Sequence, residues 1–416
     1  MNRPARWRAI TAAVAISVLA VAPACDPSEL FNDPTRQAEP TPTESSSYTG
    51  DVPEELRPVL EAYEFLNEDY VDRSELDQTA LAEAAIRGMV DQVDDPYTSY
   101  VSTRDYERQL EQLSGEFEGI GAMIEKDEDT DRIVVVSPIE GTPAEEAGLR
   151  AGDIILEVGG QSTVGWSVVQ AVNQIRGEKG TEIILTVERE GEPEPLELSI
   201  VRDTIENPSV RAEMLPYAPY ARIAIDSFTD RTPGEMRDAL EEMEEAGARG
   251  IILDLRFNPG GTLQATVDVA DLFLNAGVVT YEEYANGDRE YWRSEDGGPA
   301  LEAPLVVLVN EFSASGSEVL SAALQYHDRA TVIGEQTFGK GSVNVLRDLS
   351  EPGGGVYLTV ARWHDPSGGL IEGEGVTPDI VVRQDQETEA DEQLEAAVGH
   401  LNSMRSSSTL LQRGAG

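Results

Sequence analysis

A serine cluster and an isolated lysine are the residues best suited to covalent chemistry. Ser315 lies between two further serines in the segment NEFSASGSE, at the junction of a predicted strand and a predicted helix, and Lys340 follows 25 residues later. A serine hydroxyl is a weak nucleophile and needs a neighbouring base. A lysine can be that base only if burial lowers its pKa from about 10.4 to about 7–8. The pair therefore predicts a nucleophilic serine activated by a lysine.

The surroundings of Lys340 in the sequence fit a buried site of this kind. Phe338 lies two residues before it, and the other two lysines of the chain, Lys126 and Lys179, are far away in sequence. The histidines do not form a cluster with one another or with the single cysteine; they are His327, His364 and His400. Without an HExxH motif or a Cys/His cluster, we expect neither a metal nor another cofactor.

Glycine-rich turns near the serine and in the segment DLRFNPGG offer backbone N–H groups for a developing negative charge. That segment ends in Gly260 and Gly261, and Gly316 directly follows Ser315. Preorganised N–H groups of this type can form an oxyanion hole. Simpler explanations stand beside this one, because the glycines also fit a tight turn and Ser315 with Glu318 also fits a helix capping box.

Residues 114–204 have the pattern of a small separate domain, with short strands divided by glycine turns and two helical stretches. Two segments stand out, FEGIG at 117–121 and GLRAGDII at 148–155. Neighbouring glycines let successive backbone N–H groups converge on an anion, and an extended peptide can add as a strand beside such a loop. The pattern predicts a peptide-binding site, with a plain tight turn as the alternative.

These segments, in this order, closely resemble the carboxy-terminal processing (tail-specific) peptidases, which are PDZ-containing serine proteases with a Ser/Lys dyad. GLRAGDII and FEGIG resemble bacterial PDZ domains, SASGS and TFGKG resemble the catalytic motifs, and two further matches lie at 359–368 and 375–380. The resemblance covers about residues 55 to 385. It implies Ser315 as nucleophile, Lys340 as base, and the backbone N–H groups of Gly316, Gly260 and Gly261 as the oxyanion hole. It also implies that the loop of Phe117, Gly119, Ile120 and Gly121 binds a peptide carboxylate.

One residue departs from the pattern of this family. The family usually has a glutamine four residues after the lysine, where it helps to position the amine. This chain has Asn344 there, one methylene shorter. We expect Asn344 to take that positioning role beside Lys340.

The fold that the resemblance implies is a multidomain α+β protein, with a crotonase-like or ClpP-like α/β protease core, an inserted PDZ domain and an N-terminal helical region. The expected boundaries are a signal peptide at 1–25, a disordered linker at 26–52, a helical region at 53–113, the PDZ domain at 114–204, the peptidase core at 205–385, and a C-terminal helix and tail at 386–416. The linker is rich in Pro, Ser, Thr and Glu, a composition that cannot bury a core.

The first 25 residues predict export from the cytoplasm. Three arginines precede an apolar stretch at 9–21 that is too short to span a bilayer comfortably. The run APAC at 22–25 allows two interpretations, cleavage at an Ala-x-Ala site or lipidation of Cys25 in a bacterial lipoprotein box. Both place the mature protein in the cell envelope, the periplasm or the extracellular medium.

The charge excludes one class of partner. Asp and Glu number 78 against 31 Lys and Arg, a formal net charge of -47. Such a surface repels nucleic acid phosphates. The expected partners are protein or peptide substrates with free, apolar C-termini, a membrane through a lipid anchor, and a second copy of the chain, since relatives often dimerise through terminal helices. The alternative function is a catalytically inactive PDZ adaptor on a protease scaffold.

Overall fold

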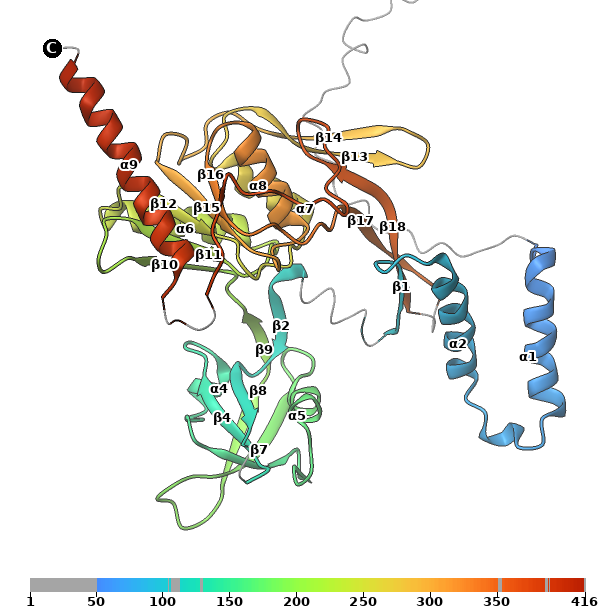
Figure 1. Cartoon of the computed structure of the whole chain (residues 1–416). Helices are drawn as coiled ribbons and strands as arrows, with labels where there is room; N and C mark the ends of the chain where they lie inside the picture. Colours follow the sequence, from blue (N-terminus) through green and yellow to red (C-terminus); the bar gives the residue numbers. More distant parts are fainter. Residues whose placement is uncertain are drawn as a thin grey trace, which may run out of the picture. The chain divides into compact units, whose positions relative to one another are not determined.

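The computed structural model describes residues 51–103, 105, 113–127, 130–350, 354–385, 388 and 390–414, with side chains as far as 405. The predicted signal peptide, Cys25 and almost all of the predicted linker lie outside these residues. The described chain is a multidomain α+β protein with an N-terminal helical region, a small β-rich domain and a larger α/β core (Figure 1).

Helices and a short strand form the described part of the N-terminal region. The elements are η2 (Glu54–Leu56), α1 (Arg57–Asp69), η3 (Arg73–Glu75), α2 (Gln78–Val90), η4 (Asp91–Val93) and β1 (Ser99–Val101). Asp77 caps α2 by accepting two backbone N–H groups. The expected helical region at 53–113, whose pattern breaks at Asp95-Pro96-Tyr97, also contains β1, which pairs antiparallel with a strand of the core. The helical stretch ends at Val93, where Asp94 takes a left-handed φ of 55°, and a turn closed by the Thr98 N–H and the Asp95 carbonyl at 3.1 Å leads to β1.

The β-rich domain is built on an antiparallel sheet. Its elements are β2 (Glu116–Gly119), β3 (Ala122–Lys126), β4 (Ile133–Pro138), α4 (Pro143–Glu146), β5 (Ile154–Val158), β6 (Gln161–Ser162), α5 (Val168–Ile175), β7 (Glu182–Glu188), β8 (Leu196–Val201) and β9 (Asp203–Glu206). The sheet has the order β3-β4-β5-β7-β8, with β6 on β5, and β2 pairs separately with β9. Within GLRAGDII, the buried Asp153 carboxylate accepts two hydrogen bonds of 2.7 Å from Arg189, so this run also stabilises the domain.

The core contains a mostly parallel sheet. Its elements are β10 (Val210–Met214), β11 (Ala221–Ile225), α6 (Thr232–Glu245), β12 (Ile251–Asp254), α7 (Leu263–Asp271), β15 (Leu305–Val309), α8 (Gly316–Tyr326), β16 (Thr331–Gly334) and β19 (Ile380–Val381). The strand order is β10-β11-β12-β15-β16-β19, and only the β10–β11 pair is antiparallel. Leu253 and Val307 face one hydrophobic cluster whereas Ile252 and Val306 face another. Burial on both faces explains why these strands read as continuous apolar runs.

A second, antiparallel sheet covers helices α7 and α8 on their other side. Its strands are β13 (Gly277–Tyr284), β14 (Arg289–Ser294), β17 (Ser342–Asp348) and β18 (Gly355–His364), together with β1 from the N-terminal region. Val343 and Trp363 of this sheet share a cluster with Leu320 of α8 and Leu253 of the parallel sheet. The core is therefore layered as sheet, helices and sheet.

Helix α9 (Glu392–Gly414) packs on the opposite face of the parallel sheet. Leu394, Ala397 and Leu401 are buried there against Ile252 and neighbouring strand residues. Their spacing of three and four residues is that of one helix face. Within the described ranges, no helix combines the length and the apolar character that crossing a membrane requires.

Candidate active site

Three loops meet at the carboxyl ends of adjacent parallel strands. The segment DLRFNPGG follows β12, the serine segment follows β15, and the segment with Lys340 follows β16. In open α/β sheets, ligands bind outside the carboxyl ends of the strands. The parallel order β12-β15-β16 therefore brings together the three segments that the sequence singled out.

Ser315 has an unusual backbone conformation at the start of α8. Its φ is 56° and its ψ is -116°, in a region that side chains with a Cβ rarely adopt. Such a conformation costs of order 1–3 kcal/mol and persists only where the surroundings impose it. Here the Ser315 N–H donates to Glu318 Oε2 at 2.8 Å, and the neighbouring Ala314 N–H donates to the Asn258 carbonyl at 3.0 Å. A strained serine between a strand and a helix is typical of a nucleophile.

The two serines that flank Ser315 have structural hydrogen bonds. Both side chains are fully buried; the Ser313 hydroxyl donates to the Leu255 carbonyl at 2.8 Å and the Ser317 hydroxyl donates to the Asn258 carbonyl at 3.0 Å. These bonds fasten the serine segment to the loop after β12. Ser315 is the member of the trio that lines a cavity together with Lys340, Gly260 and Gly261.

The glycines are required for close approach to Ser315. A Cβ on Gly260 would lie 2.6 Å from the Ser315 Cβ, and one on Gly261 would lie 2.0 Å from the Phe228 carbonyl oxygen. The Gly260 N–H, which we expected in the oxyanion hole, donates to Asn258 Oδ1 at 2.8 Å. The Gly260 N–H is therefore already engaged, whereas Gly316 lies at the N-terminus of α8, where the helix dipole favours negative charge.

Lys340 lies in a partly buried position. Burial lowers the pKa of its amine, and the carboxylates of Glu372 and Glu318 oppose that shift without cancelling it. The expected role of Phe338 in this burial is wrong, because its side chain is 57% exposed. The aromatic ring at the amine belongs to Tyr97, whose centroid is 5.3 Å from Lys340 Nζ. No motif of the sequence indicated Tyr97, since Asp95-Pro96-Tyr97 reads only as a helix terminator.

Glu318 joins the nucleophile to the lysine segment. Its buried carboxylate accepts the N–H groups of Ser315, Gly339 and Lys340 and the Thr337 hydroxyl. Burial raises the pKa of Glu318, and these four hydrogen bonds act in the opposite direction. The sequence identified Glu318 only as half of a capping box. The structure adds that the same carboxylate fixes both loops.

Comparison with known proteins identifies the family. The model of peptidase family S41 matches residues 219–382, that of the PDZ domain matches 110–188, and that of the activating protease CtpB N-terminal domain matches 22–104. The chain is 39% identical over 338 residues to the carboxy-terminal processing protease CtpA of Bacillus subtilis, a match covering 81% of this chain and 70% of that protein. The chain belongs to peptidase family S41.

Two further matches are also described as C-terminal processing proteases. The carboxy-terminal-processing protease of Bartonella bacilliformis is 40% identical over 313 residues, which cover 74% of this chain and 71% of that protein. A solved structure of a photosystem II D1 C-terminal processing protease is 30% identical, with coverage of 84% of this chain and 98% of that chain and a TM-score of 0.47. The S41 peptidase described here is a serine-type, C-terminal processing protease whose PDZ domain binds peptide C-termini.

Asn344 of this S41 peptidase does not take the expected position beside the lysine amine. Its Nδ2 donates to the Tyr97 carbonyl at 3.0 Å and to the Thr359 hydroxyl at 2.9 Å, and its Oδ1 accepts from the Ser342 hydroxyl at 3.0 Å. Both amide protons are therefore directed at other groups. The shorter side chain explains the difference, because it ends at the segment that carries Tyr97.

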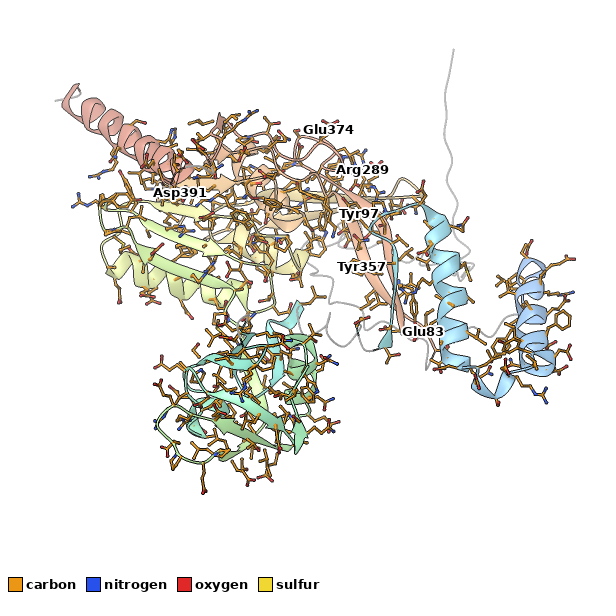
Figure 2. The ribbon with its side chains drawn as sticks, turned by 60° about the horizontal axis from the view of Figure 1, so that its bottom comes forward. Glu83, Tyr97, Arg289, Tyr357, Glu374 and Asp391 are labelled. Atoms are coloured by element: carbon orange, nitrogen blue, oxygen red, sulfur yellow. The ribbon has the colours of Figure 1, made fainter. Side chains whose placement is uncertain are left out.

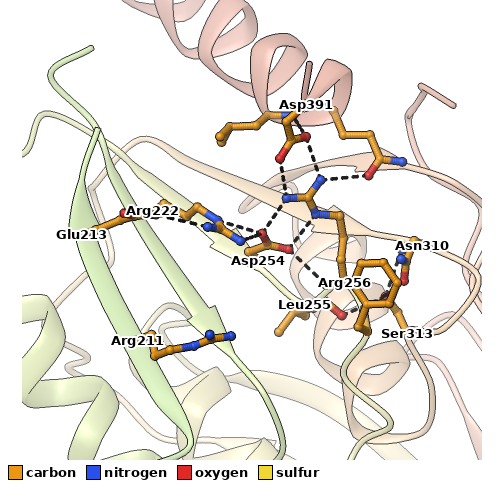
Figure 3. A network of polar contacts seen from close by, with 12 residues as sticks. Arg211, Glu213, Arg222, Asp254, Leu255, Arg256, Asn310, Ser313 and Asp391 are labelled. Carbon is orange, nitrogen blue, oxygen red and sulfur yellow. Dashed lines mark hydrogen bonds and ion pairs between the residues drawn. The ribbon is translucent and has the colours of Figure 1, made fainter. Parts of the chain in front are cut away.

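A charged network fixes the loop after β12 to helix α9. Arg256 lies between Asp254 and Asp391 in Figure 3, with N–O distances of 2.8 Å to each carboxylate. Burial disfavours the charge on Arg256, but the hydrogen bonds and attraction of both carboxylates outweigh it and raise the pKa of the guanidinium. Sequence reasoning missed this network, because Asp391 lies 135 residues after Arg256. The network of Arg256, Asp254 and Asp391 positions the backbone that leads to Gly260.

The PDZ domain of the S41 peptidase has a groove beside the expected carboxylate loop. A cavity of about 120 Å³ is lined by the following residues: Phe117, Gly119, Ile120, Gly121, Ala122, Ile124, Val172, Ile175 and Arg176. All four residues expected at the peptide site belong to this set. Gly121 has φ of 78°, and a Cβ there would lie 2.4 Å from the Thr142 side chain, so the loop depends on glycine at this position.

Proposed function

We propose that Ser315 is the nucleophile and Lys340 the general base of this peptidase, and that the Gly316 N–H stabilises the oxyanion. The observation that carries the proposal is the shared carboxylate of Glu318, which accepts N–H groups of both Ser315 and Lys340 at 2.8 Å. Both residues also line one cavity. A common anchor keeps a nucleophile and its base in register, which proximity catalysis requires.

The chemistry follows from these positions. The neutral amine of Lys340 takes the proton of the Ser315 hydroxyl while Oγ forms a bond to the substrate carbonyl carbon. The resulting ammonium gives the proton to the leaving amine as the C–N bond breaks. A water molecule then hydrolyses the acyl-enzyme by the same proton transfers. The N–H at the start of α8 lies where the helix dipole favours negative charge.

The alternative of an inactive PDZ adaptor does not fit the assignment as a serine-type peptidase. The hydrolysis of an unstructured, casein-like protein tests the role of Ser315 in that activity. We expect wild-type protein to cleave it and the Ser315→Ala variant to leave it intact. A Ser315→Ala variant that still cleaves it would exclude Ser315 as the nucleophile.

The PDZ domain is proposed to select free C-termini with apolar last residues. Ile124, Val172 and Ile175 give the groove its apolar walls, and the glycine loop closes one end. We expect a peptide with a C-terminal carboxylate and a final Val or Leu to bind about tenfold or more tightly than the same peptide amidated, because the amide cannot accept the converging N–H groups as well. Titration calorimetry with the acid and amide peptides measures this. Equal affinities would exclude carboxylate recognition.

We propose export with a lipid anchor at Cys25, on the basis of the signal pattern and the position of the single cysteine of the chain. Wild-type protein should partition into the detergent phase in a Triton X-114 separation, and Cys25→Ser should move it to the aqueous phase. Wild-type protein that is entirely aqueous would favour secretion without an anchor.

We also propose a homodimer, because α1 exposes Val59, Leu60 and Phe65. Sedimentation velocity of the wild-type protein measures its oligomeric state.

A further inference from the structure

The ring of Tyr97 covers the amine of Lys340, although 243 residues separate them in the sequence. Its centroid lies 5.3 Å from Nζ, which is within the range of a cation–π contact. Tyr97, labelled in Figure 2, belongs to the short segment between η4 and β1. The ion pairs found among the described residues do not include Lys340, so an aromatic face stands where a charged partner would otherwise be expected.

The segment that carries Tyr97 is fastened on both sides. Asn344 Nδ2 donates to the Tyr97 carbonyl at 3.0 Å. The Asp95 carboxylate accepts the Tyr97 N–H at 3.1 Å and the Thr98 hydroxyl at 2.7 Å. The Thr98 hydroxyl in turn accepts the Thr359 N–H at 3.1 Å, and β1 then pairs with β18. These bonds hold the backbone of Tyr97 against strands β17 and β18, next to the lysine loop.

We propose that Tyr97 is a positioning residue for Lys340. The Tyr97 ring excludes water from the lysine amine, and Asn344 holds the Tyr97 backbone in place. The inference rests on the proposed role of Lys340 as base. An amine must be neutral to accept the serine proton, and contact with an apolar ring face disfavours its charged form through desolvation. When the amine takes the proton, the same ring face offers attraction to the ammonium without a permanent negative charge.

The other charged groups around the amine explain why this shielding matters. Glu318 from α8 and Glu372 from the loop before β19 both raise the pKa of Lys340, and burial is the opposing cause that lowers it. Burial also raises the pKa of the Tyr97 hydroxyl, as do Glu372, Glu318 and Asp95, while Arg362 of β18 acts in the other direction. This raised pKa favours the neutral form of the tyrosine. Removing the ring should let water reach the amine. The carboxylates of Glu318 and Glu372 would then have the larger influence on the pKa of Lys340, and that pKa should rise.

The test is the pH dependence of kcat/KM for Tyr97→Ala. We expect its acid limb to move to higher pH by about one unit, so that activity on that limb falls about tenfold and recovers at higher pH. Tyr97→Phe keeps the ring and should restore the wild-type limb. Tyr97→Leu keeps an apolar cover but loses the attraction of the π face for the ammonium, so its limb should stay at the wild-type pH or lie slightly below it. A merely structural role would lower the rate equally at all pH values.

Asn344→Ala tests how the ring is held. It should shift the limb in the same direction by a smaller amount, and the double variant Tyr97→Ala/Asn344→Ala should show no shift beyond Tyr97→Ala, because the two act through one contact. Tyr217→Ala removes a tyrosine that is 63% exposed and serves as the matched control. An unshifted limb in Tyr97→Ala, with Lys340→Arg inactive, would overturn the role of Tyr97 and leave the dyad standing. An active Lys340→Arg would overturn both.

Discussion

Replacement of Ser315 by alanine should lower kcat/KM for an unstructured protein substrate by about 10⁴-fold or more, and the protein should remain folded. Alanine removes the hydroxyl that attacks the carbonyl but keeps the Cβ and the backbone. The strained φ of 56° is supported by the backbone N–H groups of Ala314 and Ser315, which donate to Asn258 and Glu318, and neither bond uses the lost oxygen. Peptide cleavage followed by mass spectrometry, with circular dichroism of the same samples, measures both parts of this expectation.

The two flanking serines are the matched controls for that experiment. Ser313→Ala and Ser317→Ala each remove a buried hydrogen bond to a backbone carbonyl, and Ser313→Ala also removes the acceptor of the Asn310 N–H. Each should cost about 1–3 kcal/mol of unfolding free energy, because a buried carbonyl loses its donor, while most of the activity remains. If Ser313→Ala or Ser317→Ala is inactive and Ser315→Ala retains activity, the nucleophile has been assigned to the wrong serine.

Replacement of Lys340 by arginine should be almost as damaging, with a loss of about 10³-fold or more in kcat/KM near neutral pH. A guanidinium keeps its proton at any pH at which proteins fold, so it cannot accept the proton of the Ser315 hydroxyl. The backbone N–H that donates to Glu318 is present in both residues, so the loop should keep its position. Any loss of kcat/KM therefore reports on the Lys340 side chain.

Lys179→Arg is the matched control for this substitution. Lys179 is exposed in the PDZ domain and forms an ion pair with Asp203 at 2.5 Å, which an arginine can also form. Its activity should equal that of the wild type. A Lys340→Arg variant as active as Lys179→Arg would remove the lysine from the mechanism.

The sequence predicts the parts of this site that depend on local patterns. Apolar runs such as Ile251–Asp254 identify buried parallel strands, and strands of that kind bring the serine and lysine loops to one edge of a sheet. Glycines 260 and 261 were recognisable because only glycine fits so close to Ser315 and Phe228. The capping box of Ser315 and Glu318 is also visible in the sequence, because the helix fixes the spacing of its two residues.

The remaining parts depend on contacts between segments that are distant in sequence. Tyr97 reaches Lys340 only because β1 joins the sheet at β18, and a three-residue strand after a proline has too little pattern to predict. The position of Asn344 in the sequence predicts a contact with the lysine amine. Its amide group instead donates to the Tyr97 carbonyl and the Thr359 hydroxyl. Glu318 satisfies four donors because its loop partners converge from another strand end, which spacing in the sequence does not show.

The dependence of kcat/KM on pH in the wild-type protein tests the Ser315/Lys340 dyad most directly. Burial lowers the pKa of Lys340, so the neutral, basic form is lost as the pH falls through that lowered value. The rate should therefore fall about tenfold per pH unit on the acid side and level off below the ordinary lysine pKa of about 10.4. A rate that stays flat from acid to mildly alkaline pH would contradict a lysine base.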